Sequence, residues 1–252
     1  MGRCVPLVVL LAITNARAES MNLLINAGFE TPVSIPTQYP SMTGIWSHDV
    51  ATIVTAQRGI TPRTGQYALR FDFAGPLGPD AVRQSVDVLQ LFDLTPYADE
   101  VASGLLVVRG SFYANRIEHD SQTDTAFGVL IAAYDGSVST FSAIRDSPLS
   151  FVQSIIETDG DTATWQKVTA ELLLPTSAKF VQFRVFAAEN VFNDSSGIEF
   201  DGHYGDDATL TITTIPIPAV SFSGCAALLI MAAGSRSSYL CLRRKGNTCA
   251  SG

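Results

Sequence analysis

The central part of this chain lacks cysteine. The four cysteines of the 252-residue sequence all lie near its ends, at Cys4, Cys225, Cys241 and Cys249. Small exported domains often depend on disulfides, and residues 19–218 cannot form one. About 200 residues are nevertheless enough to bury a core that folds alone. The absence excludes a disulfide-braced scaffold and leaves packing, with or without a metal ion, to stabilise the domain.

Positive charge is also scarce in this part of the chain. Of 16 Lys and Arg residues, six lie in the terminal segments 1–18 and 219–252, which contain no acidic residue. Residues 19–218 therefore keep ten basic residues against all 24 acidic ones, a formal net charge of −14. Nucleic acid and anionic membrane surfaces repel such a domain. We exclude nucleic acid as a partner and expect a soluble exported domain, with either a cation site or a solvated acidic surface.

Motifs that carry a catalytic mechanism are missing as well. His48, His119 and His203 have neither H-x-x-x-H nor H-x-H spacing, and no G-x-S-x-G, P-loop or C-x-x-C pattern occurs. His203 stands close to several aspartates, an arrangement that a polar turn explains better than a metal centre. We therefore expect no enzyme, although two carboxylates at glycosidase spacing remain an alternative that sequence alone cannot place.

Helical periodicity is scarce, and strand patterns replace it. Val181, Phe183 and Val185 alternate with other residues at the period of two expected for a strand with one buried face. The segment 91–102 is the one short helical or irregular insert that we expect. Short β-branched and aromatic runs between turn residues predict strands at 22–29, 51–56, 67–73, 81–88, 104–115, 126–134, 165–174, 179–188 and 208–213. Such a series predicts an all-β jelly-roll sandwich over residues 19–214.

The N-terminus has the three parts of a signal peptide. Arg3 precedes an apolar run at 5–13, and Ala16-Arg17-Ala18 follows it. This order of a charged region, a short apolar region and small residues at the cleavage site is typical of secretion signals. We expect residues 1–18 to be removed after Ala18 and the rest of the chain to be exported.

The C-terminus has a tripartite tail at residues 215–245. Two prolines open it, an apolar run at 220–242 follows, and three basic residues close it before the short end at 246–252. Spanning a membrane takes roughly 20 apolar residues, but the cleanest stretch, 219–234, is shorter and Arg236 follows it. The basic end favours a cytoplasmic C-terminus with the domain outside. A transmembrane-type helix and a processing signal are both open, with signal residues Pro216, Pro218, Ala219, Arg243, Arg244 and Lys245.

This tail resembles the PEP-CTERM class of bacterial sorting tails in its V-P-L-P-A-like form. The matching parts are Ile-Pro-Ile-Pro-Ala at 215–219, the short apolar run and Arg-Arg-Lys at 243–245. The resemblance implies export machinery and a membrane protease of the exosortase type as partners. It also implies a location in the cell envelope, at the cell surface or outside the cell. Arg236 and residues 246–252 depart from the usual compact ending.

The body resembles galactose-binding-like carbohydrate-binding modules. Residues 22–30, Asn-Leu-Leu-Ile-Asn-Ala-Gly-Phe-Glu, are similar to the opening N-L-x-x-N-G-G-F-E of that family. Ile45-Trp46, the loop and strand at 59–69, Trp165-Gln166-Lys167-Val168 and Gly205-Asp206-Asp207-Ala208-Thr209-Leu210 follow in the family's order. Ala27 stands where the family usually has Gly, and Ala208 where it has Val. The resemblance implies the sandwich fold and one structural Ca²⁺.

The implied calcium ligands are Glu30 and one of Asp206 or Asp207. Main-chain carbonyls near Thr64 and Gly65 would complete a shell of about six to eight oxygen atoms. The ion would then join the first and last strands of the sandwich. The alternative is a solvated strand-end carboxylate at Glu30 and a polar turn at Asp206 and Asp207.

A sugar site is a weaker expectation. Tyr113 and Asn115 share one face of an expected strand, and Gln182 and Arg184 share one face of another. If the two faces coincide on a concave sheet, they supply a ring for stacking and polar groups for orientation. The alternative is an outer strand face with ordinary polar residues. Trp46 and Trp165 are expected in the core because the resemblance places packing residues there.

Three functions remain open from the sequence. The first is a non-catalytic module that binds a polysaccharide or an extracellular matrix and is sorted, or held at a membrane, through its tail. The second is a structural surface or matrix protein without a small ligand. The third is a glycan-active hydrolase, which a cleft with two close carboxylates of raised pKa would favour.

Overall fold

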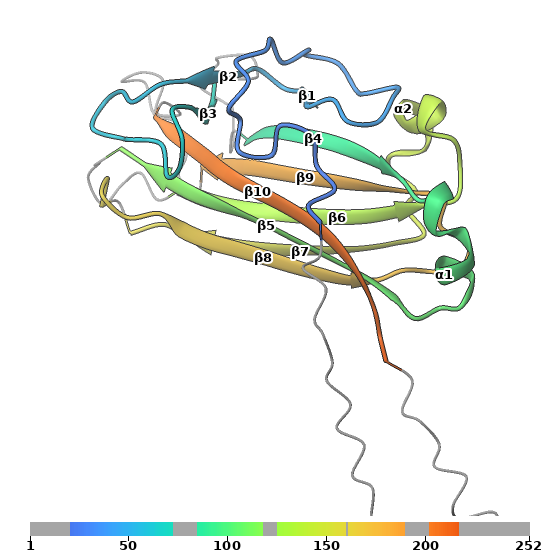
Figure 1. Ribbon diagram of the computed structural model, residues 1–252. Helices are drawn as coiled ribbons and strands as arrows, with labels where there is room; N and C mark the ends of the chain where they lie inside the picture. Colours follow the sequence, from blue (N-terminus) through green and yellow to red (C-terminus); the bar gives the residue numbers. More distant parts are fainter. Residues whose placement is uncertain (1–20, 73–84, 118–124, 160, 190–201, 217–252) are drawn as a thin grey trace, which may run out of the picture. The chain divides into compact units, whose positions relative to one another are not determined.

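The chain folds into two antiparallel sheets packed face to face (Figure 1). The computed structural model describes residues 21–72, 85–117, 125–159, 161–189 and 202–216. Sheet A has the order β1-β4-β9-β6-β7 and sheet B the order β2-β3-β10-β5-β8. The strands of sheet A are β1 (Ser47–His48), β4 (Ser85–Asp93), β9 (Phe180–Glu189), β6 (Thr125–Tyr134) and β7 (Ser150–Glu157). Those of sheet B are β2 (Ala51–Val54), β3 (Ala68–Phe71), β10 (His203–Thr214), β5 (Leu106–Arg116) and β8 (Gln166–Leu173).

The strand pairing is that of a jelly roll. The innermost pair is β6 with β7, and the pairs β5 with β8, β4 with β9 and β3 with β10 nest around it. Successive pairs alternate between sheet A and sheet B, as they do when one long antiparallel hairpin is wound into two sheets. The all-β sandwich expected from the sequence is therefore confirmed.

The main core fills the space between the two sheets. Along β9, Val181, Phe183 and Val185 are at most 1% exposed and belong to this core. Phe112 on β5 and Leu210 on β10 meet them from sheet B. Alternate residues of each strand therefore point into the core, and the intervening ones form the two outer faces of the sandwich. This geometry determines which side chains a ligand can reach.

A second, smaller cluster covers part of the outer face of sheet A. Leu89 and Leu91 of β4 pack there with Tyr134 and Phe180 against Phe141. Phe141 begins the short helix α2 (Phe141–Ile144), which follows the 3-10 turn η2 (Val138–Thr140). Both α1 (Ala98–Ala102) and α2 lie at one end of the sandwich (Figure 1). The outer face of sheet A is thus apolar and covered at this end, and it opens toward the middle of the strands.

Some expected elements differ from the observed ones. Residues 22–29 form turns instead of a strand, with positive φ at Asn26 and Phe29. The segment still runs beside β10, because Leu23 N donates to Leu210 O at 2.8 Å. The apolar residues that suggested a strand include Leu24 and Phe29, which are buried although the segment forms turns.

The insert expected at 91–102 is partly strand. Its first three residues continue β4, and only then do η1 (Thr95–Tyr97) and α1 follow. The strands β1 and β7 and the helix α2 were not predicted. β1 has two residues, too few to show a period, and its pairing with β4 alone defines it.

The two targeting segments lie almost wholly outside the described residues. Ala16 and Ala18 of the expected signal peptide belong to the part not described, as do Pro218, Ala219, Arg243, Arg244 and Lys245 of the tail. Pro216, the last residue described, is exposed. Among the helices that the structure does describe, none has the length and apolar character needed to cross a membrane.

Candidate functional site

A groove of about 260 Å³ opens on the outer face of sheet A. Strands β4, β9 and β6 form its floor, while the loop before β1 and the segment between α2 and β7 form its walls. Most of the polar atoms come from outward-facing positions of the strands. The residues that line it include Leu89, Leu130, Ala132, Tyr134, Gln182 and Arg184 on the floor and Tyr39, His48, Asp87, Arg145, Asp146 and Phe151 around it.

Arg184 and Asp87 form the central ion pair of the groove. Arg184 Nη1 lies 2.9 Å from Asp87 Oδ2, and the two side chains are only 27% and 15% exposed. Burial raises the pKa of Asp87, while the neighbouring Arg184 guanidinium offsets part of that rise. The pair is therefore held in place, and its orientation is set before any ligand arrives.

Tyr134 fixes the amide of Gln182. Its hydroxyl lies 2.9 Å from Gln182 Oε1 and 2.8 Å from the carbonyl oxygen of Arg145. Its ring stacks on Phe180 with centroids 5.0 Å apart. Burial raises the pKa of Tyr134 to about 12, so the phenol stays neutral in the physiological range. The single hydroxyl proton goes to one of these two oxygens, and the contact holds the Gln182 side chain against Tyr134 on the floor of the groove.

Two aromatic side chains stand at the walls. The Tyr39 ring stacks on His48 at 4.2 Å between centroids, and the Arg145 guanidinium carbon lies 4.1 Å from the centre of the same ring. Tyr39 is thereby held against the groove. Phe151 projects outward from β7 and is 61% exposed. The groove therefore combines one restrained ring, one open ring and a floor of fixed polar groups.

The structure separates the four residues expected to bind sugar. Gln182 and Arg184 lie on the outer face of sheet A and line the groove. Tyr113 and Asn115 belong to β5, on the outer face of sheet B. Outward residues of two stacked sheets point in opposite directions, so the four cannot contact one ligand. The condition for a shared sugar site, that the two faces coincide, is therefore not met.

Local contacts of Tyr113 and Asn115 indicate a structural role. Asn115 is 2% exposed and its Nδ2 donates to Thr162 O at 2.9 Å. The Arg63 guanidinium carbon lies 3.6 Å from the centre of the Tyr113 ring, and Lys167 Nζ lies 5.5 Å from it. The Tyr113 ring is therefore occupied by cations of the protein itself.

The tryptophans have different surroundings. Trp46 is 4% exposed, packs on Phe29 at 5.3 Å between centroids, and donates from Nε1 to Ile25 O at 3.0 Å. It is a core residue, as expected. Trp165 is half-buried at the surface, where its Nε1 donates to Thr61 O at 3.2 Å. Neither ring lines the groove.

The carboxylates expected to bind calcium hold the loop at 61–67. Glu30 accepts hydrogen bonds from Gln66 N at 2.9 Å and Tyr67 N at 3.3 Å. Asp207 binds the Arg63 guanidinium through Oδ2 and the Thr64 hydroxyl through Oδ1. We call these contacts the acidic clasp. It joins the beginning and the end of the domain, as the resemblance implied, but through direct protein contacts.

Asp206 plays a different part in the acidic clasp. It is fully buried, and its carboxylate accepts from the backbone N–H groups of Arg63, Thr64 and Asp207. Burial, reinforced by the charge of Asp207, raises the pKa of Asp206 to about 7. Its oxygen atoms are thus committed to the backbone, which makes Asp207 the better calcium candidate of the two.

Glu30 and Asp207 both lie beside glycine residues. A Cβ atom at Gly28 would lie 3.4 Å from Asp207 Oδ1 and 3.8 Å from Glu30 Cγ. Gly65, at a φ of 65°, leaves the place that the Glu30 carboxylate occupies, since a side chain there would collide with it. Both carboxylates already accept hydrogen bonds from the loop at 61–67. Carboxylate oxygens are donors that suit Ca²⁺, so the chemistry of Glu30 and Asp207 fits the implied ion.

A second hollow, of about 480 Å³, lies on the outer face of sheet B. Arg109 and Glu171 form an ion pair there, with side chains 52% exposed. Ser111 and Thr209 share a hydrogen bond of 2.7 Å. No aromatic residue is among its lining residues. This surface lacks the ring that sugar stacking uses.

Each of the two carboxylates that line the groove of sheet A has an arginine partner. Asp87 is paired with Arg184, and Asp146 Oδ2 lies 3.3 Å from Arg145 Nε. The raised pKa of Asp87 alone does not make an acid–base pair, because a second positioned carboxyl group must activate water or attack the sugar.

Sequence reasoning missed most residues at the walls of the groove. Phe151 could have been found, because the sequence of residues 150–157 contains aromatic and β-branched residues typical of a strand. In the structure these residues alternate in exposure along β7. Tyr39 was not, because it lies in an irregular segment without periodicity. His48 and Asp87 come together only through the pairing of β1 with β4.

The sequence matches no protein-family model and no curated protein. Similar solved structures include the N-terminal CBM22-1-CBM22-2 tandem domain from Paenibacillus barcinonensis Xyn10C, at 18% identity and a TM-score of 0.43. The match covers 81% of this chain and 52% of that one, so this chain spans about half of it. Another is a family 16 carbohydrate-binding module-2, at 11% identity and a TM-score of 0.42, covering 75% and 99% of the two chains. Similarities at this level establish neither the family nor the ligand of this chain.

Proposed function

We propose that this protein is a non-catalytic carbohydrate-binding module whose ligand occupies the groove of sheet A. One observation carries the proposal: an exposed aromatic ring, Phe151, stands beside fixed polar groups from Gln182, Arg184 and Asp87 in one open groove. Sugars present C–H faces that stack on rings and hydroxyls that need oriented donors and acceptors.

The polar groups of the groove are suited to hydroxyls because they are already held in place. Arg184 is fixed by Asp87, and Gln182 by Tyr134. A ligand then meets groups that lose little freedom on binding, which lowers the cost of association. With a volume of about 260 Å³, the groove suits a short part of a saccharide chain more than a long one.

Binding to a panel of soluble polysaccharides tests this function. Phe151→Ala and Arg184→Ala should each weaken binding about tenfold or more, since each removes a stacking or charged contact. Tyr113→Ala is the matched control, because it removes an aromatic residue from the opposite face. Equal losses in all three variants would overturn the groove. Absence of binding across the panel would favour the structural surface or matrix protein instead.

We also propose that Glu30 and Asp207 bind Ca²⁺, with main-chain carbonyls near Thr64 and Gly65 as further ligands. The oxygen of Asp207 that would bind the ion is Oδ1, which accepts from the Thr64 hydroxyl, because the Arg63 guanidinium holds Oδ2. When bound, the ion would stabilise the fold by joining both ends of the domain. Millimolar CaCl₂ added to the EDTA-treated protein should raise the melting temperature of the wild type and leave that of Glu30→Gln unchanged. An unchanged wild-type melting curve would contradict the proposal.

For the chain ends we propose export followed by sorting through the C-terminal tail. The sequence of residues 215–245 supports this, with permanent anchoring in a membrane as the alternative. Mass spectrometry of the protein from its native host distinguishes the two. A mature C-terminus near Pro218 supports removal by an exosortase-type protease, whereas an intact tail supports anchoring.

A further inference from the structure

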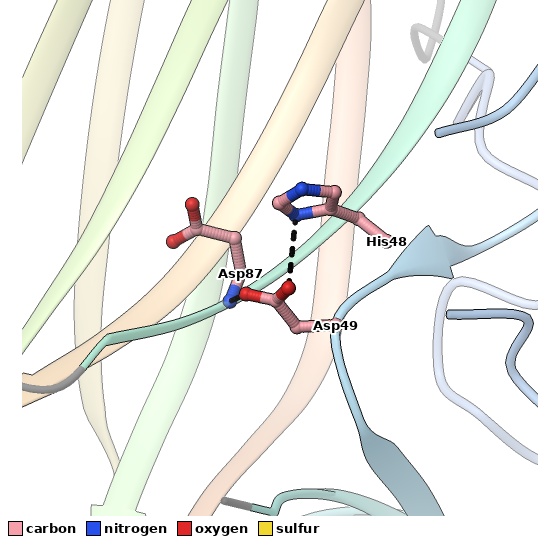
Figure 2. Close-up of side chains that lie close together, drawn as sticks. All are labelled: His48, Asp49 and Asp87. Carbon is pink, nitrogen blue, oxygen red and sulfur yellow. Dashed lines mark hydrogen bonds and ion pairs between the residues drawn. The ribbon is translucent and has the colours of Figure 1, made fainter. Parts of the chain in front are cut away.

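Three side chains with metal-binding groups meet beside the groove: His48, Asp49 and Asp87 (Figure 2). One ligand atom from each lies within 4.8 Å of the others. Within the described part of the chain, no other three residues of these types gather this closely. They come from strand β1, the residue after it, and strand β4. The cluster is thus built by the pairing of two neighbouring strands, not by a run of acidic residues.

Backbone contacts hold the two aspartates together. Asp49 N donates to Asp87 O at 3.1 Å, and Asp87 N donates to Asp49 Oδ2 at 2.9 Å. Asp87 Oδ2 accepts from Arg184 Nη1 at 2.9 Å. Each carboxylate therefore has one oxygen engaged by the protein. The other oxygens, Asp49 Oδ1 and Asp87 Oδ1, accept no hydrogen bond from any described residue.

His48 is held in place through its backbone and through its ring. His48 N donates to Pro36 O at 2.9 Å, and the ring stacks on Tyr39 at 4.2 Å. His48 also has a φ of 122°, a region that non-glycine residues rarely adopt. Such strain persists only where the surroundings hold the residue firmly. The ring therefore occupies a determined position at the edge of the groove.

The surroundings of His48 Nδ1 leave this atom unsatisfied. It is buried, and among the described residues it has no hydrogen-bond partner. The nearest carboxylate oxygen, Asp49 Oδ1, lies 3.5 Å away, a contact that is an ion pair only when His48 is protonated. Figure 2 marks this contact with a dashed line. A buried polar atom without a partner costs free energy. A metal ion between Nδ1 and the two uncommitted carboxylate oxygens would satisfy all three atoms.

We propose that His48 Nδ1, Asp49 Oδ1 and Asp87 Oδ1 bind one divalent transition-metal ion, of which Zn²⁺ is the best fit. A single imidazole with two carboxylates suits zinc, whereas Ca²⁺ and Mg²⁺ prefer oxygen ligands alone. Bonds to zinc of about 2.0–2.2 Å require the three side chains to draw closer than they are without the ion. Arg184 and the backbone N–H of Asp87 would remain as the groups that orient the carboxylates.

The charge of the cluster favours a cation. Two largely buried carboxylates face one guanidinium, so one negative charge is left when His48 is neutral. Because His48 and Asp87 line the groove, a coordination position left open on the ion would face the groove. Binding of a ligand hydroxyl at that position rests on the proposed function, whereas the metal site itself does not.

Titration of the EDTA-treated, dialysed protein with ZnCl₂ tests the site. Calorimetry should give one high-affinity equivalent of Zn²⁺, and heats for CaCl₂, which arise at Glu30 and Asp207, should be the same in wild type and His48→Gln. His48→Gln and Asp49→Asn should each weaken binding about tenfold or more. His119→Gln, which removes another of the three histidines, is the matched control. Substituting Co²⁺ should give a visible absorption band that His48→Gln abolishes.

Two outcomes would overturn the site: no Zn²⁺ binding, or binding that His48→Gln leaves unchanged. Melting curves recorded in EDTA establish that each variant is folded, so loss of binding is not mistaken for loss of structure. Phe151→Ala separates this proposal from the carbohydrate proposal. It should keep the zinc site and lose the sugar, while failure of sugar binding in every variant leaves the zinc result standing on its own.

Discussion

Arg184 is the residue on which the polar floor of the groove depends. It projects from β9 by the alternation of that strand and pairs with Asp87 of the neighbouring strand. Both side chains are less than one-third exposed, so solvent does not fully replace a lost partner. A residue expected from the sequence to bind sugar therefore also has a structural role.

Replacing Arg184 by Met should lower the free energy of unfolding at pH 7 by roughly 1–3 kcal/mol, because Asp87 is left without its charged partner. The double variant Arg184→Met/Asp87→Asn should recover much of that loss. Urea denaturation of the two single variants and the double variant, as a double-mutant cycle, measures the coupling. Additive effects would mean that the pair contributes nothing.

The burial of Asp206 predicts the direction in which the stability of the fold changes with pH. The pKa of Asp206 in the folded protein is about 7, above its ordinary value of 3.8. The folded state therefore holds this proton more tightly than the unfolded state does. The resulting stabilisation is complete below about pH 4 and is lost as the pH rises toward 7.

In EDTA, the wild type should therefore lose stability between pH 4 and pH 7, and Asp206→Asn should lose less over the same range. The slope is the informative quantity, since Asn also weakens the bonds from Arg63 N and Thr64 N. Denaturant melts at several pH values measure it. Parallel slopes for the two proteins would contradict the account of the acidic clasp.

At the scale of elements, the sequence predicted strands well where one face is buried along their length. β9 is the clearest example, since Val181, Phe183 and Val185 enter the core as the alternation indicated. The strand predicted at 22–29 was wrong, because buried residues in a turn can give the same sequence pattern as a strand. The alternation of residues along a strand also says nothing about which sheet the strand joins. The sequence therefore left open whether Tyr113 and Gln182 share a face, and they lie on opposite sides of the sandwich.

Because Phe183 of β9 lies in the hydrophobic core, Phe183→Ala should strongly destabilise the fold. Phe183 is fully buried, packs edge-on against Trp46 at 6.1 Å, and lies so close to Gly110 that a Cβ atom there would be 2.5 Å from its ring. Truncation should lower the free energy of unfolding by about 3–5 kcal/mol. Phe151→Ala, at a largely exposed position, is the matched control and should change it by about 0.5 kcal/mol or less. Similar values for the two would contradict the assigned faces.

At the scale of the whole molecule, the jelly roll places the core and the groove on different faces of sheet A. The space between the sheets holds the core, the acidic clasp joins the first and last segments, and the outer face of sheet A presents the groove. The groove could not be predicted from sequence, because one wall comes from an irregular loop and the other from the segment between α2 and β7. The acidic character of residues 19–218 and the basic end of the tail were visible in the sequence, and the export and sorting expected from them stay predictions.

The central claim is that a saccharide binds the groove of sheet A. The most direct test is to follow backbone amide chemical shifts of labelled protein during titration with a polysaccharide found to bind. We predict shifts concentrated at Gln182, Arg184 and Phe151, with those of Arg109 and Glu171 on sheet B unchanged. Shifts concentrated on the sheet B residues, with the groove residues silent, would contradict the claim.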